Sequence, residues 1–240
     1  MNLVLYLIIL AYFLTGGVIM FYINEKKISR DKKQNWLKYF IYFLIANLLF
    51  GSVMINANYF HYLSIIIVSI SFFEIIRLTF ITGKLKTGLL SVIFLAVLSF
   101  PFLGFSLLDR QLLIIVLFIV NIFDGFSQLT GQLLGKIKIL SLVSPKKTAE
   151  GLIGGYLVSI LSSILIFKML NKGFLPALCI GFGISTFAFL GDLSASYIKR
   201  KFDVKDYSRL LPGHGGILDR FDSLIFSGSF IYIIKTYIDI

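Results

Sequence analysis

The sequence predicts an all-α, polytopic integral membrane protein, because of its composition and the length of its apolar runs. Of its 240 residues, 58% are hydrophobic, 16% are aromatic and only 15% are charged, whereas a soluble domain carries about 25% charged residues. The apolar runs are roughly twenty residues long, the length at which a helix crosses about 30 Å of hydrocarbon. They do not alternate polar and apolar residues, which argues against a β-barrel.

About eight membrane-spanning helices are predicted along the chain. Their approximate ranges are 3–23, 37–56, 59–80, 88–107, 111–135, 150–170, 173–198 and 222–238. The first range is expected to be a permanent span, since no basic residue precedes it and no small-residue cleavage site follows it. We divide the chain into N-terminal transmembrane helices, residues 1–110, and a C-terminal catalytic transmembrane region with cytoplasmic loops, residues 111–240.

The distribution of basic residues predicts how these helices are oriented. The net charge is +11, and 19 of the 23 lysines and arginines lie on the first, third, fifth and seventh connections. Cytoplasmic loops carry this excess of positive charge, so both termini are expected outside. Because orientation explains the charge, no nucleic-acid partner is expected. On the first connection the basic residues are Lys26, Lys27, Arg30, Lys32, Lys33 and Lys38.

Three carboxylates are predicted inside spans, where ionisable groups are costly and usually functional. Glu74, Asp124 and Asp192 each follow the midpoint of a span that runs from outside to inside. The sequence therefore predicts one polar cavity that opens to the cytoplasm. For Glu74, a structural ion pair with Arg77, one helical turn away, is an equally good alternative.

Two polar stripes extend from these carboxylates at helical spacing. Asp192, Ser196 and Lys199 share one helix face. Small residues in the second stripe would let a substrate or another helix come close, although helix packing is the commoner use of such glycines. The second stripe consists of Asp124, Gln128, Gly131 and Gly135.

The fifth connection carries hydroxyl and ammonium groups just before the next helix. Residues 144–151 read Ser-Pro-Lys-Lys-Thr-Ala-Glu-Gly. Pro145 interrupts helix, and a helix N-terminus is a ready site for anions. A simple basic cytoplasmic loop is the alternative for this segment.

The longest polar segment in the chain is residues 194–222, which contain six basic and four acidic residues. Its glycine-rich turn, residues 212–216, exposes backbone N–H groups that can cradle phosphate. Asp219 and Asp222 are three residues apart and share a face of a helical turn, with Arg220 between them. The segment could therefore provide both metal ligands and an anion clamp.

This segment resembles the signature of the phosphatidate cytidylyltransferase (CDP-diacylglycerol synthase) family. Residues 144–151 are similar to a second motif of that family, and Phe73-Glu74-Ile75 to its acidic-aromatic element, so the resemblance covers residue 74 and residues 121–222. The sixteen matching positions of the signature are Ser196, Lys199, Arg200, Lys205, Asp206, Ser208, Leu211, Pro212, His214, Gly215, Gly216, Ile217, Asp219, Arg220, Phe221 and Asp222.

The resemblance implies that CTP and phosphatidate react to give CDP-diacylglycerol and pyrophosphate, in the plasma (inner) membrane with the active site facing the cytoplasm. It implies Mg²⁺, with a second cation left open, and membrane lipids as partners; a homodimer is compatible with it. The implied catalytic residues are Asp192, Asp219, Lys199, Arg200, Lys205 and Arg220. The implied metal ligands are Asp192, Asp219 and Asp222. The implied substrate-binding residues are Asp124, Ser144, Lys147, Thr148, Glu150, Ser196, His214, Gly215 and Gly216.

Three alternatives stay open from the residues themselves. Cytidylyl transfer to another lipid phosphate would use the same groups, and a CTP-dependent lipid kinase would need a general base for a neutral alcohol. A transporter could use the buried carboxylates as a proton relay, but it has no need of the glycine-rich basic segment. The single cysteine, Cys179, lies in an apolar run and excludes an internal disulfide.

Overall fold

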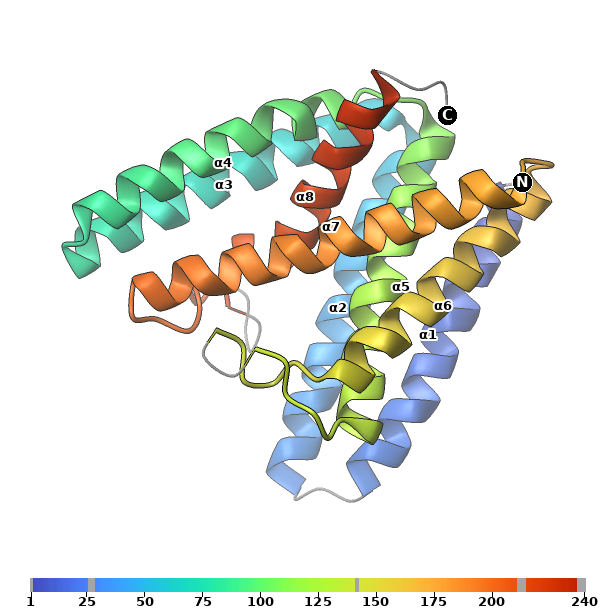
Figure 1. Ribbon diagram of the computed structural model, residues 1–240, viewed down its shortest axis with the longest axis horizontal. Coiled ribbons are helices and arrows are strands. Elements are labelled where there is room, and N and C mark those ends of the chain that lie inside the picture. Colours follow the sequence, from blue (N-terminus) through green and yellow to red (C-terminus); the bar gives the residue numbers. More distant parts are fainter. Residues whose placement is uncertain (1, 26–28, 141–142, 211–214, 237–240) are drawn as a thin grey trace.

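The computed structural model describes residues 2–25, 29–140, 143–210 and 215–236, and it confirms the all-α prediction (Figure 1). Within these ranges the chain forms helices and no strands, apart from one isolated bridge between Lys138 and Thr148. The helix bounds follow the predicted spans to within several residues. The helices are α1 (Asn2–Glu25), α2 (Ser29–Ile55), α3 (Ala57–Thr82), α4 (Leu85–Phe105), α5 (Arg110–Leu134), α6 (Ala149–Met169), α7 (Phe174–Lys201) and α8 (Leu218–Lys235).

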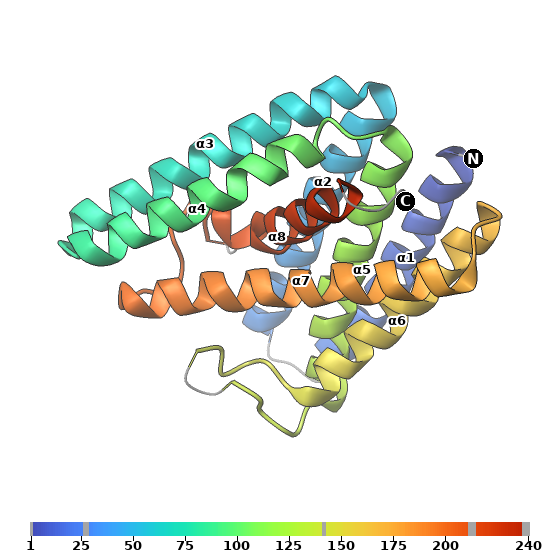
Figure 2. The same ribbon diagram turned by 45° about the horizontal axis from the view of Figure 1, so that its top comes forward.

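Helices α2 to α7 each contain a segment long and apolar enough to cross a membrane, and α1 contains the shorter apolar helix Leu10–Tyr22 among its described residues. The last helix differs from the expected apolar span 222–238. Helix α8 has 18 residues, and its first turns contain Asp219, Arg220 and Asp222. Most of its side chains are buried, and it lies between the α3–α4 pair and α7 (Figure 2). Helix α8 is therefore an interior element of the protein.

The helices spread apart towards one end of the molecule. The N-terminal end of α1, the C-terminal end of α8 and the α2–α3, α4–α5 and α6–α7 connections lie at the upper right in Figure 1. The α3–α4 and α7–α8 connections lie at the left, the α5–α6 connection lies below them, and the C-terminal end of α1 and the N-terminal end of α2 lie at the bottom, where the helices diverge. This arrangement agrees with the alternation of the predicted spans, because the basic connections share one end.

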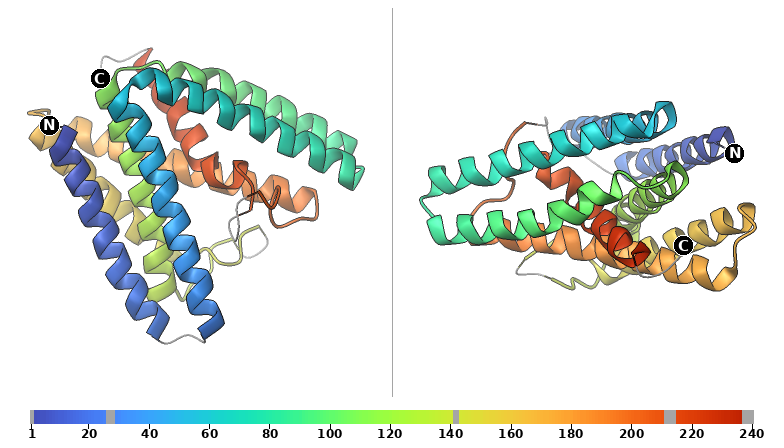
Figure 3. Two further views of the ribbon diagram at one scale, coloured as in Figure 1. Left: turned by 180° about the vertical axis from the view of Figure 1, so that it is seen from behind. Right: turned by 90° about the horizontal axis from the view of Figure 1, so that it is seen from above.

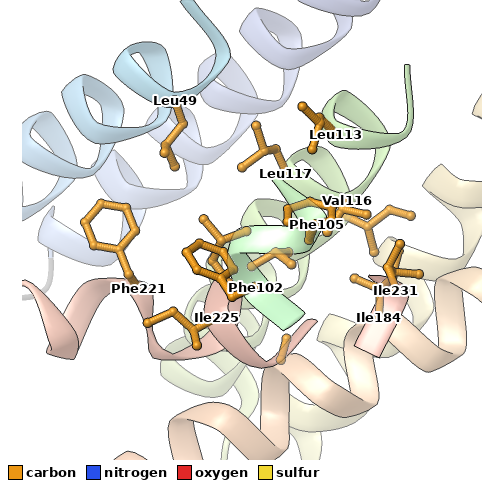
Figure 4. Close-up of a cluster of buried hydrophobic side chains, with 14 of the residues drawn as sticks. Leu49, Phe102, Phe105, Leu113, Val116, Leu117, Ile184, Phe221, Ile225 and Ile231 are labelled. Carbon is orange, nitrogen blue, oxygen red and sulfur yellow. The ribbon is translucent and has the colours of Figure 1, made fainter. Parts of the chain in front are cut away.

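Helix α5 is the centre of the packing. Its residues from Leu112 to Val120 are all buried, which is typical of a helix that is apolar on every face. Helices α1 and α2 lie beside it (Figure 3). Its side chains Leu113, Val116 and Leu117 form a cluster with residues of α2, α4, α7 and α8 (Figure 4). These contacts hold the N-terminal and C-terminal helices around one apolar core.

Two glycines allow close contacts between helices around this core. A Cβ atom on Gly155 of α6 would lie 3.1 Å from the carbonyl oxygen of Phe123 on α5. A Cβ atom on Gly191 of α7 would lie 2.6 Å from the carbonyl oxygen of Asp222 on α8. The second contact brings the helix segments that carry Asp192 and Asp222 together.

Candidate functional site

A cavity of about 1050 Å³ lies among α1, α2, α5, α7, α8 and the α5–α6 and α7–α8 connections. Its lining includes Asn35 in the N-terminal part of α2 and Gln132 in the C-terminal part of α5, both next to basic connections. Small-molecule sites are usually about 300–1,000 Å³, so the cavity has room for a nucleotide together with part of a second molecule. One of its walls, from α1 and α2, is rich in aromatic side chains such as Tyr12, Phe13 and Tyr42.

Four carboxylates from three helices line this cavity. They are Asp124 of α5, Asp192 of α7, and Asp219 and Asp222 of α8. The hydroxyl of Ser223 donates to Asp124 at 3.3 Å, and the backbone N–H of Ser223 donates to Asp222 at 2.7 Å. The prediction that Asp124 and Asp192 share one polar cavity agrees with this geometry.

Lysines pair with two of the four carboxylates. The Nζ atom of Lys147 lies 2.5 Å from Asp192 and 4.5 Å from the centre of the Phe189 ring. The Nζ atom of Lys199 lies 2.6 Å from Asp219, in a pair that is almost fully shielded from solvent. Each pair joins two of the segments in which the sequence motifs lie.

Asp219 also holds the α7–α8 connection against α8. One of its oxygens accepts the backbone N–H groups of Tyr207, at 2.9 Å, and Gly216, at 2.8 Å. The ring of Tyr207 is buried, and its hydroxyl donates to the carbonyl of Ala195 at 3.1 Å. Burial, together with nearby carboxylates, raises the pKa of the Tyr207 hydroxyl well above its usual value. Tyr207 therefore remains a neutral hydrogen-bond donor.

Glu74 lies outside the cavity lining, and the expectation that it shares the cavity with Asp124 and Asp192 is wrong. Its oxygens accept the hydroxyl of Ser208 at 2.6 Å and the backbone N–H groups of Ile217 and Leu218, both at 2.9 Å. The two backbone N–H groups are among the unpaired donors that every helix N-terminus leaves. Glu74 is therefore a cap for α8, and its partners among the described residues are not the predicted Arg77.

The α5–α6 connection supplies part of the cavity wall. Ser144, Lys147 and Thr148 line the cavity as the motif predicts, and Lys146 joins them. Thr148 is also the N-cap of α6, since its hydroxyl accepts the backbone N–H of Gly151 at 3.2 Å. Glu150 is not in the lining. Its carboxylate accepts the backbone N–H groups of Lys136 and Ile137 and so fixes the chain after α5.

Other predicted site residues occupy different positions. Lys205, Gly215 and Arg220 line the cavity. The guanidinium of Arg200 donates to the carbonyls of Val143 and Val204, which ties the two basic connections together. Ser196, Lys199, Arg200 and Gly216 lie outside the lining, and Ser196 donates to Asp192 at 3.4 Å. His214 lies outside the described residues.

The sequence interpretation missed the contribution of α2 to the cavity. Asn35, Lys38, Tyr39 and Tyr42 all line it. They recur at i, i+3, i+4 and i+7, the spacing of one helix face, and that spacing could have identified them. From the sequence, Lys38 counts only among the basic residues that predict the orientation of the chain.

The donor set of the cavity bears on the predicted Mg²⁺. Among the residues that the structure describes, no three His, Cys, Asp or Glu side chains are grouped closely enough to hold a metal ion. Magnesium in nucleotide sites is usually held by one or two carboxylates plus substrate phosphates. Asp124 and Asp222, both joined to Ser223, fit that smaller requirement.

Comparison with known proteins identifies the family of this chain. A family model described as the cytidylyltransferase family matches residues 2–238. The chain belongs to the cytidylyltransferase family. The match includes α1 and α2, which lie outside the motifs found in the sequence.

Several curated proteins resemble this cytidylyltransferase-family chain. A phosphatidate cytidylyltransferase of Helicobacter pylori is 43% identical over 130 residues, which are 54% of this chain and 47% of that protein. One of Staphylococcus saprophyticus is 44% identical over 110 residues, 45% of this chain and 42% of that protein. One of Bacillus subtilis is 42% identical over 114 residues, 46% of this chain and 42% of that protein. The matches therefore span about half of this family member and less than half of each relative.

Proposed function

We propose that the protein transfers CMP from CTP to phosphatidate, which gives CDP-diacylglycerol and pyrophosphate for phospholipid synthesis. The observation that carries this proposal is the cavity of about 1050 Å³, in which carboxylates and cations from separate segments line one space inside an apolar helical body. A reaction between a triphosphate and a lipid phosphate needs charges of both kinds at the membrane. The names of the curated relatives support the same reaction.

The chemistry requires positioning and charge neutralisation rather than a base. An oxygen of the lipid phosphate, already anionic at neutral pH, would attack the α-phosphorus of CTP. The bond from that phosphorus to the bridging oxygen of the β-phosphate would break, and pyrophosphate would leave with the electron pair. Holding two anions in line is then the main task of the protein.

The residues of the cavity divide this task between them. Lys147, Thr148 and Ser144 lie together at the N-terminus of α6 and are suited to the triphosphate. Lys205 of the α7–α8 connection and Arg220 of α8 line the same cavity and are suited to phosphate charge. Lys199, which is paired with Asp219, would neutralise phosphate charge from beside that carboxylate. Arg200 has a structural place between the two basic connections, from which it would support the site.

We propose Mg²⁺ as the cation of this site. Asp192, Asp219 and Asp222 are the ligands expected from the motifs, and Asp124 joins them in the cavity lining. Of these, Asp192 and Asp219 are neutralised by lysine, which favours Asp222 and Asp124 as the groups that hold the cation. When bound, Mg²⁺ would neutralise charge on the phosphates of CTP.

We also propose that the cavity faces the cytoplasm from the inner membrane. The basic connections that line it follow the positive-inside pattern, and CTP is a cytoplasmic nucleotide. Phosphatidate would enter from the surrounding lipid, with its acyl chains against the apolar and aromatic wall from α1 and α2.

A double-label experiment tests the reaction. The purified protein is given phosphatidate and CTP labelled at the α- or the γ-phosphate, and the products are separated. Cytidylyl transfer puts the α-label in lipid and the γ-label in pyrophosphate. A lipid kinase would instead put the γ-label in lipid and release CDP, and that result would refute the proposal.

A further inference from the structure

We propose that Lys38 of α2 binds a substrate phosphate inside the cavity, so that the N-terminal helices complete the binding site. The inference rests on the proposed function for the identity of the anion, which is a phosphate of CTP or of phosphatidate. It assigns a role to a helix that carries none of the motifs found in the sequence.

Lys38 occupies a fixed place in the cavity wall. It is half-buried and lines the cavity with its helical neighbours Asn35, Tyr39 and Tyr42. The hydroxyl of Tyr39 donates to the carbonyl of Phe13 on α1, and that of Tyr42 donates to the carbonyl of Asn121 on α5 at 2.8 Å. These two bonds set the rotation of α2, and so they keep Lys38 on the cavity side.

The charges that act on Lys38 point to an anion. Three cations from other segments interact with it: Lys146, Lys205 and Arg220. One acid, Asp206, opposes this repulsion. Lys146, Lys205, Arg220 and Asp206 all line the same cavity. Among the charged groups that act on Lys38, cations therefore outnumber acids, and this local excess of positive charge attracts anionic ligands, although the four helix carboxylates also line the cavity.

Orientation of the chain does not by itself account for Lys38. Lys32 and Lys33 precede it and lie before the apolar segment Asn35–Ile55, whereas Lys38 lies within that segment. A charge inside a span is costly unless it serves a polar cavity or partner. The alternative is that Lys38 extends to the membrane surface and only anchors α2, as lysines near helix ends often do.

The experiment measures ligand binding directly, so that it does not depend on turnover. The full-length protein is placed in nanodiscs, and its melting temperature is recorded over a range of CTP concentrations. A second series compares phosphatidylcholine nanodiscs with nanodiscs that also contain phosphatidate. Ligands that bind the folded state raise the melting temperature according to their affinity. The variants are Lys38→Gln, Lys38→Arg and, as the matched control, the exposed Lys33→Gln.

Lys38→Gln is expected to reduce the binding affinity for one of the two ligands by about tenfold to a hundredfold, the usual loss for a charged hydrogen bond. Lys38→Arg should recover part of this loss, and Lys33→Gln should stay within about twofold of the wild type. A change in CTP affinity assigns Lys38 to the nucleotide, and a change with phosphatidate assigns it to the lipid.

Unchanged affinity for both ligands in Lys38→Gln, or an equal change in Lys33→Gln, would overturn the inference. If Lys38→Gln does not fold, Lys38→Met keeps the length of the apolar stem and takes its place. The proposed function would fail in a different way. If the wild-type protein binds CTP through Lys38 but transfers no CMP, the role of Lys38 in binding stands and the proposed reaction does not.

Discussion

The carboxylate of Glu74 on α3 accepts the backbone N–H of Leu218 at 2.9 Å and thereby caps α8 from another helix. Ile217 and Ser208 donate to the same carboxylate. Since Asp219 and Asp222 lie in the first turns of α8, the cap on α3 determines where two cavity carboxylates stand. Glu74 acts on the site through this helix and not by contact with the cavity.

Glu74→Ala should destabilise the protein by about 3 kcal/mol or more, because three donors lose their acceptor and each costs about 1–3 kcal/mol when buried and unpaired. CMP transfer should fall with it as α8 shifts. Thermal unfolding in detergent and initial rates measure the two effects. Arg77→Ala, an exposed change one turn away, is the control and should alter neither. A Glu74→Ala protein with normal stability would contradict the capping role.

Asp219→Asn should reduce turnover by about a hundredfold or more, as expected for loss of a charge at a reacting phosphate. It should also lower stability by about 1–3 kcal/mol, because an amide cannot accept on both sides as the carboxylate does from Lys199, Tyr207 and Gly216. Asp203→Asn is the matched control, since Asp203 is exposed and pairs with Lys84 on the surface. Full turnover in Asp219→Asn would remove Asp219 from the site.

Gly191→Ala should destabilise the α7–α8 contact by about 1–3 kcal/mol, the usual cost of overpacking. The new methyl group would lie 2.6 Å from the carbonyl oxygen of Asp222, a backbone atom that cannot rotate away. Asp192 and Asp222 should then move apart and activity should drop. Gly51→Ala is the control, because open space surrounds Gly51. Equal melting temperatures for the two variants would show that the contact is looser than described.

Cysteine labelling tests the orientation of the cavity. Single cysteines replace Lys146 or Lys172 in a protein that carries Cys179→Ala. A membrane-impermeant maleimide on intact cells should label position 172 at once and position 146 only after the cells are opened, because basic connections remain in the cytoplasm. Labelling of position 146 in sealed cells would reverse the proposed orientation.

Removal of divalent cations tests the proposed Mg²⁺ site. Excess chelator should abolish CMP transfer, and added Mg²⁺ should restore it. In Asp124→Asn the rate should recover partly at high Mg²⁺, because one ligand charge is lost while Asp222 remains in the cavity lining. Rates are measured across a Mg²⁺ titration for both proteins. Full activity in the presence of chelator would exclude the metal from the reaction.

The sequence alone determined where the helices form and that the basic connections lie at the same end of the molecule. Apolar runs of spanning length must become helices in lipid, since their backbone groups have no other partners there. The depth of Asp124 and Asp192 in their spans predicted that they would share a cavity, and the family resemblance placed Ser144, Lys147 and Thr148 in the same site; all five line the cavity.

Contacts between distant segments were decided only by the tertiary structure. Glu74 contacts Ser208 across 134 positions, Lys38 lines the cavity from a helix without motifs, and most side chains of α8 are buried inside the protein. Sequence patterns report which face of a helix is polar, but not which helix lies opposite that face. That choice depends on close contacts such as Gly191 against the carbonyl of Asp222, where the packing of two backbones sets the position of the charged groups.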